Sequence, residues 1–377
     1  MSDFQPGPQS SSQPQPAPRP APPAAATRAS SGLEKHDDGH ARLALGPLGL
    51  RIHRRSAWVG AILAVLVAAA VLVALVLPGA GVETKDAFGV IFAGQGGFDA
   101  TVVVNWRLPR VLAAVLVGAA LALSGAIFQS LTRNPLGSPD VIGFNTGAYT
   151  GAILVTLGGV TGFAAIAGGA FVGGLITALA VYLLSLRAGS SGLRMVVVGL
   201  GVAAMLGAFN RWLISVGDLE LSMQAAAWGA GSLNGLRWAQ VTPVAVALLV
   251  FIAAAFLVAR RMQPLDLGDD AAAGLGLRLG ATRLLLLAVG VALTAVSTAI
   301  AGPISFVALA APHIARRITR ASRVSPLPVA LTGAFIVVVA DIVAQRLFDP
   351  TQLPVGIVTV TLGGLYLITL LSKEARR

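Results

Sequence analysis

Residues 141–186 form a stretch of 46 residues that contains no Asp, Glu, Lys or Arg. As one helix it would extend about 70 Å, because a helix rises about 1.5 Å per residue. The hydrocarbon core of a bilayer is only about 30 Å thick. Two crossings separated at Gly158-Gly159 account for this length. The stretch therefore predicts a chain that folds largely in lipid.

The composition of the whole chain agrees with this prediction. Hydrophobic residues make up 55% of it and charged residues only 11%, whereas charged residues are about 25% of an ordinary soluble domain. The mean hydropathy is +0.80. These values exclude a soluble globular enzyme.

Ten segments have the length and apolar character expected of membrane helices. They are residues 57–77, 108–131, 141–157, 160–186, 193–213, 240–259, 282–301, 304–319, 327–347 and 354–372. The Gly302-Pro303 break divides the 32 residues between Arg283 and Arg316 into a full helix and a shorter one. Pairs of glycines four positions apart, such as Gly147 with Gly151 and Gly169 with Gly173, favour close helix packing. We therefore expect an all-α integral membrane protein.

The distribution of basic residues predicts the orientation. If the N-terminus is cytoplasmic, 18 of the 27 Lys and Arg residues lie in inner segments, six in outer segments and three in the N-terminal tail. This agrees with the excess of basic residues in cytoplasmic loops. Both termini are then expected in the cytoplasm of a multi-pass cell-membrane protein. Residues 1–50, rich in Pro in their first half, are expected to be a disordered tail before a permease domain at 51–377.

Several chemistries lack the residues they require. The chain has no Cys, and none of its three Lys residues follows Gly, so no P-loop is present. His313 is the one histidine in a predicted span, where packing at a helix end is expected. Asp341 is the one ionisable residue deep in a span, four residues before Gln345 and five before Arg346. A local polar cluster and ion coupling both remain open for Asp341, so a gradient-driven transporter of a small molecule is the alternative function.

Two loops have residues suited to intermolecular contacts. The outer segment Arg107-Leu108-Pro109-Arg110 carries two guanidinium groups that could bind lipid phosphates or carboxylates of a partner. The inner segment at 264–276 contains Asp269 and Asp270, which suit the start of a short helix beneath the membrane. These loops are the candidate contact sites.

Several motifs together resemble one family, the FecCD permeases, which are membrane subunits of ABC importers for ferric siderophores, haem and cobalamin. The motifs are Arg107-Leu-Pro-Arg110, the run 118–139 with Arg133-Asn134-Pro135-Leu136, the inner loop at 264–276, Gly302-Pro303-Ile304-Ser305-Phe306-Val307 with Pro312-His313, and Leu353-Pro354-Val355-Gly356. The segment 228–235, with Arg211-Trp212, looks most like members that transport ferric enterobactin. Residues 1–50 lie outside the resemblance.

The resemblance implies a type II importer bundle of ten helices that works as a homodimer or heterodimer. Two separate ATPase subunits would hold ATP and Mg²⁺, and a siderophore-binding protein would dock from outside. The chain itself would be neither an enzyme nor the holder of a cofactor or metal. The implied contacts are binding-protein docking by Arg107, Arg110 and Arg346, ATPase coupling by Leu265, Gly268, Ala271, Ala272, Leu275 and Gly276, and an inner gate at Asn134, Leu136, Ser190 and Ser191.

Overall fold

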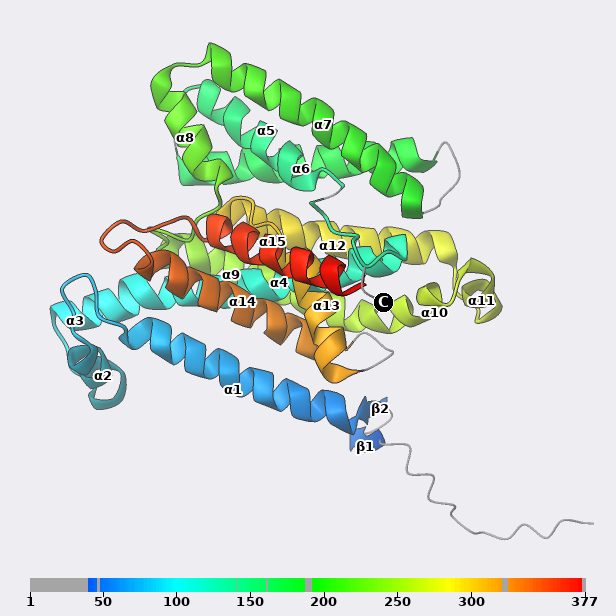
Figure 1. The fold of residues 1–377 in the computed structure, drawn as a ribbon, viewed down its shortest axis with the longest axis horizontal. Coiled ribbons are helices and arrows are strands. Elements are labelled where there is room, and N and C mark those ends of the chain that lie inside the picture. Colours follow the sequence, from blue (N-terminus) through cyan, green and yellow to red (C-terminus); the bar gives the residue numbers. More distant parts are fainter. Residues whose placement is uncertain are drawn as a thin grey trace, which may run out of the picture. The chain divides into compact units, whose positions relative to one another are not determined.

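The computed structural model describes residues 40–45, 48–140, 142–160, 162–186, 192–320 and 325–374. The chain divides into two units, residues 1–38 and 39–377, and all of the described residues belong to the second. Within them, every regular element except one hairpin is a helix (Figure 1). The expected all-α class is therefore confirmed for the described part of the chain.

Each of the ten predicted segments coincides with a helix in the described part of the chain. These helices are α1 (Arg54–Val76), α4 (Leu108–Thr132), α5 (Phe144–Leu157), α6 (Phe163–Leu186), α7 (Gly192–Val216), α9 (Trp238–Val258), α12 (Leu279–Ala301), α13 (Val307–Thr319), α14 (Pro326–Arg346) and α15 (Val355–Glu374). Seven spans of the described residues are long and apolar enough to cross a membrane, and a shorter apolar helix covers Val355–Tyr366.

Helices α5 and α13 are shorter than a full crossing. Their 14 and 13 residues extend about 20 Å each at 1.5 Å per residue. The connection before α5 lies against α12 and the break that follows it. Asn145 donates to the Asp140 carboxylate and accepts from Thr298 at 3.2 Å, and the Phe306 backbone N–H also donates to Asp140. These bonds hold the residues before α5 against α12 and the break before α13, and the Phe306 N–H is satisfied by a protein group.

Short helices flank the long ones. They are α2 (Thr84–Ala93), α3 (Phe98–Ala100), the π-helix η1 (Thr101–Arg107), α8 (Leu219–Gly229), the 3₁₀ turn η2 (Ala259–Arg261), α10 (Met262–Asp266) and α11 (Asp269–Gly274). Because η1 runs directly into α4, the predicted second span begins earlier than expected, and Phe98–Thr132 forms 35 continuous helical residues.

A hairpin occupies residues that the sequence assigned mostly to the tail. Strands β1 (His40–Leu45) and β2 (Leu48–His53) pair antiparallel, with His40 opposite His53 and Leu45 opposite Leu48. This part of the chain has Leu at alternate positions in each strand, the period of a strand. Residues 1–39 of the expected tail lie outside the described residues.

Helix α4 is the centre of the bundle. It is buried along nearly its whole length and packs against α9, α12, α13 and α14, while α5, α6, α7 and α8 group together beside α12 (Figure 1). A Cβ at Gly118 would overlap the backbone of Gly333 in α14, and a Cβ at Gly125 would overlap the backbone of Ala308 in α13. Only glycine permits these approaches.

The predicted glycine contacts are confirmed between α5 and α6. A Cβ at Gly147 would overlap Thr177 and meet the backbone of Gly173, and one at Gly151 would overlap the backbone of Gly169. Small residues let backbones approach closely where lipid gives no hydrophobic driving force between helices. The four glycines therefore join α5 and α6 into a tight pair.

Candidate functional site: the two ends of α4

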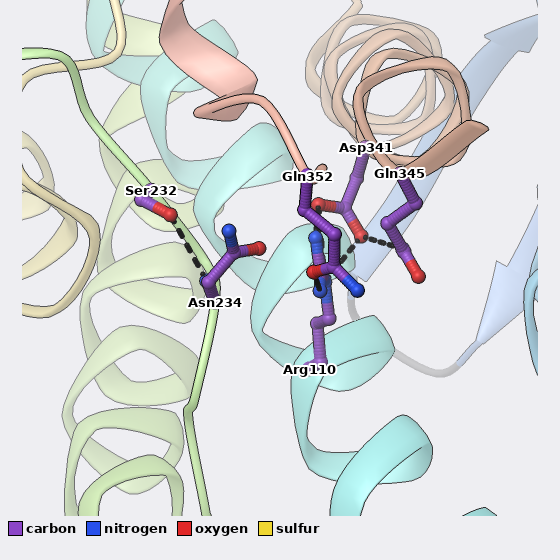
Figure 2. Close-up of polar contacts among 6 residues, drawn as sticks. All are labelled: Arg110, Ser232, Asn234, Asp341, Gln345 and Gln352. Carbon is purple, nitrogen blue, oxygen red and sulfur yellow. Dashed lines mark hydrogen bonds and ion pairs between the residues drawn. The ribbon is translucent and has the colours of Figure 1, made fainter. Parts of the chain in front are cut away.

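An ion pair lies near the start of α4. Arg110 donates from Nε and Nη2 to both carboxylate oxygens of Asp341 in α14, at 2.8–3.2 Å (Figure 2). Gln345 also donates to Asp341 at 2.8 Å, and Arg110 Nη1 donates to Gln352 at 2.9 Å. The Arg110 side chain is 11% exposed and that of Asp341 only 2%. This group joins α4, α14 and the connection to α15.

The expected polar cluster at Asp341 is therefore present, but with a different arginine. Gln345 belongs to it as predicted, whereas Arg346 points elsewhere and Arg110, 231 positions away, supplies the charge. This pairing explains why a carboxylate is tolerated in this span. Because Asp341 holds Arg110 in this pair, Arg110 is less accessible for a partner than the sequence suggested.

Arg107 and Arg346 converge on the end of α1. Arg107 donates to the carbonyls of Leu75 and Gly79, each at 2.7 Å, and Arg346 donates to the carbonyl of Pro78. The last carbonyls of a helix lack intrahelical partners, so the bond to Leu75 caps α1. The bonds to Pro78 and Gly79 hold the turn that follows α1. Within the described part of the chain, neither guanidinium forms an ion pair with a carboxylate. Their positive charge is therefore not neutralised locally.

The connection between α8 and α9 passes close to this end of the bundle. Ser232 N–H donates to the Ala301 carbonyl at 2.7 Å, and Gly356 N–H donates to the Gly231 carbonyl at 3.0 Å. Ser232 Oγ accepts from Asn234 N–H at 3.1 Å, and the Asn234 side chain points toward the Arg110 group in Figure 2. Segment 228–235 is thus held against the end of α12 and the start of α15.

The other end of α4 is closed by a tight turn. Arg133 adopts the left-handed conformation (φ 50°), and its N–H donates to the Gln129 carbonyl. Asn134 Oδ1 accepts from Leu136 N–H at 2.9 Å, and the Asn134 carbonyl accepts from Gly137 N–H at 2.9 Å. Leu136 is exposed. The gate candidates Asn134 and Leu136 therefore lie on one rigid turn, whereas Ser190 and Ser191 lie outside the described residues.

The predicted short helix in the inner loop is present as α11, and the unpredicted α10 precedes it. The predicted contact face needs correction. Leu265 is 2% exposed and Ala272 is fully buried in the core, so neither side chain is available to an ATPase. Leu275 and the unpredicted Leu267 are 63% and 70% exposed. Ala271 and Gly276 are exposed too, and Gly268 (φ 110°) and Gly276 (φ 82°) supply conformations that L side chains rarely adopt.

Asp269, at the start of α11, pairs with two arginines. It accepts from Arg133 at the end of α4, and Arg283 in α12 donates to both of its oxygens at 2.7 and 2.8 Å. The sequence placed Asp269 at a helix start but not in these ion pairs, because its partners are 136 and 14 positions away.

His313 links α13 to α15. Its Nδ1 lies 2.6 Å from the hydroxyl of Tyr366 in α15.

Comparison with known proteins gives consistent matches. The model of the FecCD transport family matches residues 59–373. The chain is 52% identical over 295 residues to the ferric enterobactin transport system permease protein FepG of Escherichia coli, covering 78% of this chain and 89% of that protein. It is 34% identical over 336 residues to the probable siderophore transport system permease protein YfhA of Bacillus subtilis, covering 86% and 97%. The structure is also similar to an inward-facing conformation of a putative metal-chelate type ABC transporter, with a TM-score of 0.74 and 26% sequence identity. This match covers 84% of this chain and 99% of the transporter chain.

Proposed function

The chain belongs to the FecCD transport family, and from that premise we propose that it is the membrane permease subunit of an ATP-driven importer of a ferric siderophore. The observation that carries this proposal is the 52% identity to FepG over nearly all of that protein. The helical bundle centred on α4 supplies the pathway, and the free energy for transport comes from ATP bound with Mg²⁺ by separate ATPase subunits.

The proposed assembly has a second permease copy or a related permease beside this chain, ATPases on the cytoplasmic side and a siderophore-binding protein on the outer side. The distribution of basic residues supports this orientation, with both termini in the cytoplasm. This orientation places α10 and α11 on the cytoplasmic side, toward the ATPases. Leu267, Ala271 and Leu275 are the exposed apolar residues of this loop that the ATPases would contact.

Arg107 and Arg346 are the best-supported docking residues. Both guanidinium groups are held in fixed positions by carbonyls, and they are close enough to repel each other electrostatically. A fixed, uncompensated positive pair suits acidic residues of a binding protein, since complementary charge increases the association rate and specificity. Arg110 contributes by holding the outer ends of α4 and α14 together.

Transport then requires two conformations that the partners stabilise differently. Docking of the loaded binding protein and closure of the ATPases must favour a state in which the axis is open, because a ligand shifts an equilibrium only by its differential affinity. The turn at Asn134 and Leu136 is the proposed inner gate of that axis, since it is a rigid element with an exposed apolar tip.

The proposed cargo is a catecholate siderophore complex of Fe³⁺, and the name of the relative FepG specifies ferric enterobactin. The test is uptake of ⁵⁵Fe in cells whose own copy of this chain is deleted and then restored on a plasmid. We expect restored uptake of ferric enterobactin and little change in uptake of ferric hydroxamates or haem, or of cobalamin labelled with radioactive cobalt. Uptake of ferric enterobactin that is unaffected by the deletion would refute the cargo assignment.

Energy coupling is tested in the same cells. We expect ATP depletion by arsenate to stop uptake even while a respiratory substrate maintains the proton gradient. Uptake that persists under ATP depletion and stops with an uncoupler would instead support the gradient-driven alternative, in which Asp341 would be the coupling group.

A further inference from the structure

Two acidic residues of the inner loop contact two residues at the C-terminal end of α4. Asp266 of α10 accepts a hydrogen bond from Ser130, and Asp269 of α11 forms an ion pair with Arg133. The acidic residues are three positions apart, and so are their partners on α4. Ser130 lies in the last turn of α4, and Arg133 is the left-handed residue that ends the helix. The loop is therefore attached to the C-terminal end of α4 at two successive points.

Other contacts restrict the freedom of this attachment. Arg283 of α12 holds both Asp269 oxygens, which fixes the direction of the carboxylate that Arg133 meets. Arg133, Asp269 and Arg283 are 40%, 40% and 19% exposed, so the group is partly withdrawn from water. On the other side, Gln129 donates to the Leu309 carbonyl at 3.1 Å and accepts from Arg316. The end of α4 thus joins the loop, α12 and α13.

Arg133 also leads directly into the turn that carries the gate candidates. The N–H groups of Arg133 and Asn134 both donate to the Gln129 carbonyl, the latter at 3.2 Å. Pro135 has a fixed φ, and Asn134 Oδ1 holds Leu136 N–H. These bonds restrain the backbone from Arg133 to Leu136. The guanidinium of Arg133 is held by Asp269 at the other end of the side chain, so Arg133 connects the inner loop to this turn.

We propose that the Asp269–Arg133 ion pair makes α11 and the Asn134–Leu136 turn move as one body, so that Arg133 is the positioning residue through which the ATPase-facing loop moves the inner gate. This inference rests on the proposed function, because it requires ATPases beneath the loop. Asp266–Ser130 is the second attachment, and Arg283 orients Asp269 without reaching the turn.

The first test uses the complete importer in proteoliposomes with ferric enterobactin, and measures uptake and ATP hydrolysis in the same preparation. Arg133→Gln keeps a hydrogen-bonding side chain but removes the charge. We expect at least a tenfold loss of uptake with ATP hydrolysis within twofold of the wild type. Arg133→Lys should recover uptake substantially, and Arg260→Gln, a matched exposed arginine on the same side, should change neither rate.

The outcomes separate the possibilities. Wild-type uptake by Arg133→Gln would overturn the inference. A proportional loss of uptake and hydrolysis, not recovered by Arg133→Lys, would also overturn it, because the pair would then serve only assembly. A wild-type complex that transports no ferric siderophore would refute the proposed function instead.

A second test uses the absence of cysteine from the chain. The double variant Arg133→Cys with Asp269→Cys can be joined by a short bifunctional thiol reagent that is cleaved by reduction. If the two positions move as one body, the linked protein regains uptake lost in the unlinked variant, and reduction removes it again. If linking instead stops the remaining uptake, the two positions must separate during transport, and the inference is wrong.

Discussion

The ion pair of Arg110 and Asp341 should dominate the stability of the outer end of the bundle. Asp341→Ala leaves the Arg110 guanidinium, with its side chain only 11% exposed, without a counter-charge. Removing one partner of a buried ion pair costs about 3–5 kcal/mol. Gln352 still accepts from Arg110 at 2.9 Å, so we expect the lower end of this range, about 3 kcal/mol.

The reverse change and a paired replacement complete the cycle. Arg110→Ala leaves Asp341 with Gln345 as its remaining side-chain donor, so its cost should be similar. Replacing both residues, with Arg110→Met and Asp341→Leu, removes both charges and keeps apolar volume. Such replacements are often neutral or stabilising. We therefore expect the double variant to be within about 1 kcal/mol of the wild type.

The assay is denaturant unfolding of the purified chain in mixed micelles, supported by the midpoint of thermal aggregation. Single variants as stable as the wild type would show that the pair is not desolvated in the membrane. A double variant whose cost equals the sum of the two single costs would show that the residues do not interact energetically. Either result would refute the assignment of this pair as a structural link between α4 and α14.

Three further predictions concern docking, packing and partner contact. The double variant Arg107→Gln with Arg346→Gln keeps hydrogen-bond donors at the end of α1 but removes two charges. The affinity of the complex for its binding protein should therefore fall about tenfold and lose its dependence on salt. Unchanged affinity would contradict the docking role. Gly125→Ala places a Cβ against the backbone of Ala308 and should lower the free energy of unfolding by at least about 1–3 kcal/mol. The readout is a lower folded yield on size-exclusion chromatography. The control Gly168→Ala, with open space at its Cβ, should not lower this yield. Leu275→Asp should reduce co-purification of the ATPase without lowering the amount of folded permease, and full retention of the ATPase would exclude this face as its contact.

The positions and order of the ten helices could be predicted because most contain a long apolar run, and seven described spans are long and apolar enough to cross a membrane. The sequence also predicted a shorter helix after Gly302-Pro303, and α5 and α13 each begin three residues later than predicted. The later starts could not be predicted, because they accompany bonds between residues distant in the sequence: Asp140 accepts from the Phe306 N–H, and Asn145 accepts from Thr298. Phe306 itself has φ +72°, which no propensity of phenylalanine indicates.

The candidate sites were predictable as loops but not as sets of contacts. The sequence shows that Arg107 and Arg110 are near one another, yet one caps α1 and the other pairs with Asp341. Nothing local distinguishes them, since both partners come from other helices. Likewise, the face of the inner loop depends on the turn at Gly268, which buries Leu265 and exposes Leu275.

The close approach of α4 and α14 also constrains how this chain can change by mutation. A Cβ at Gly118 would meet the backbone of Gly333 and Ala334, with no side chain among its nearest neighbours. A defect caused by Gly118→Ala therefore cannot be relieved by trimming a neighbouring residue, since the facing position is already glycine. Suppressor mutations should map to residues that shift a whole helix, and a screen for revertants should return mainly the original codon.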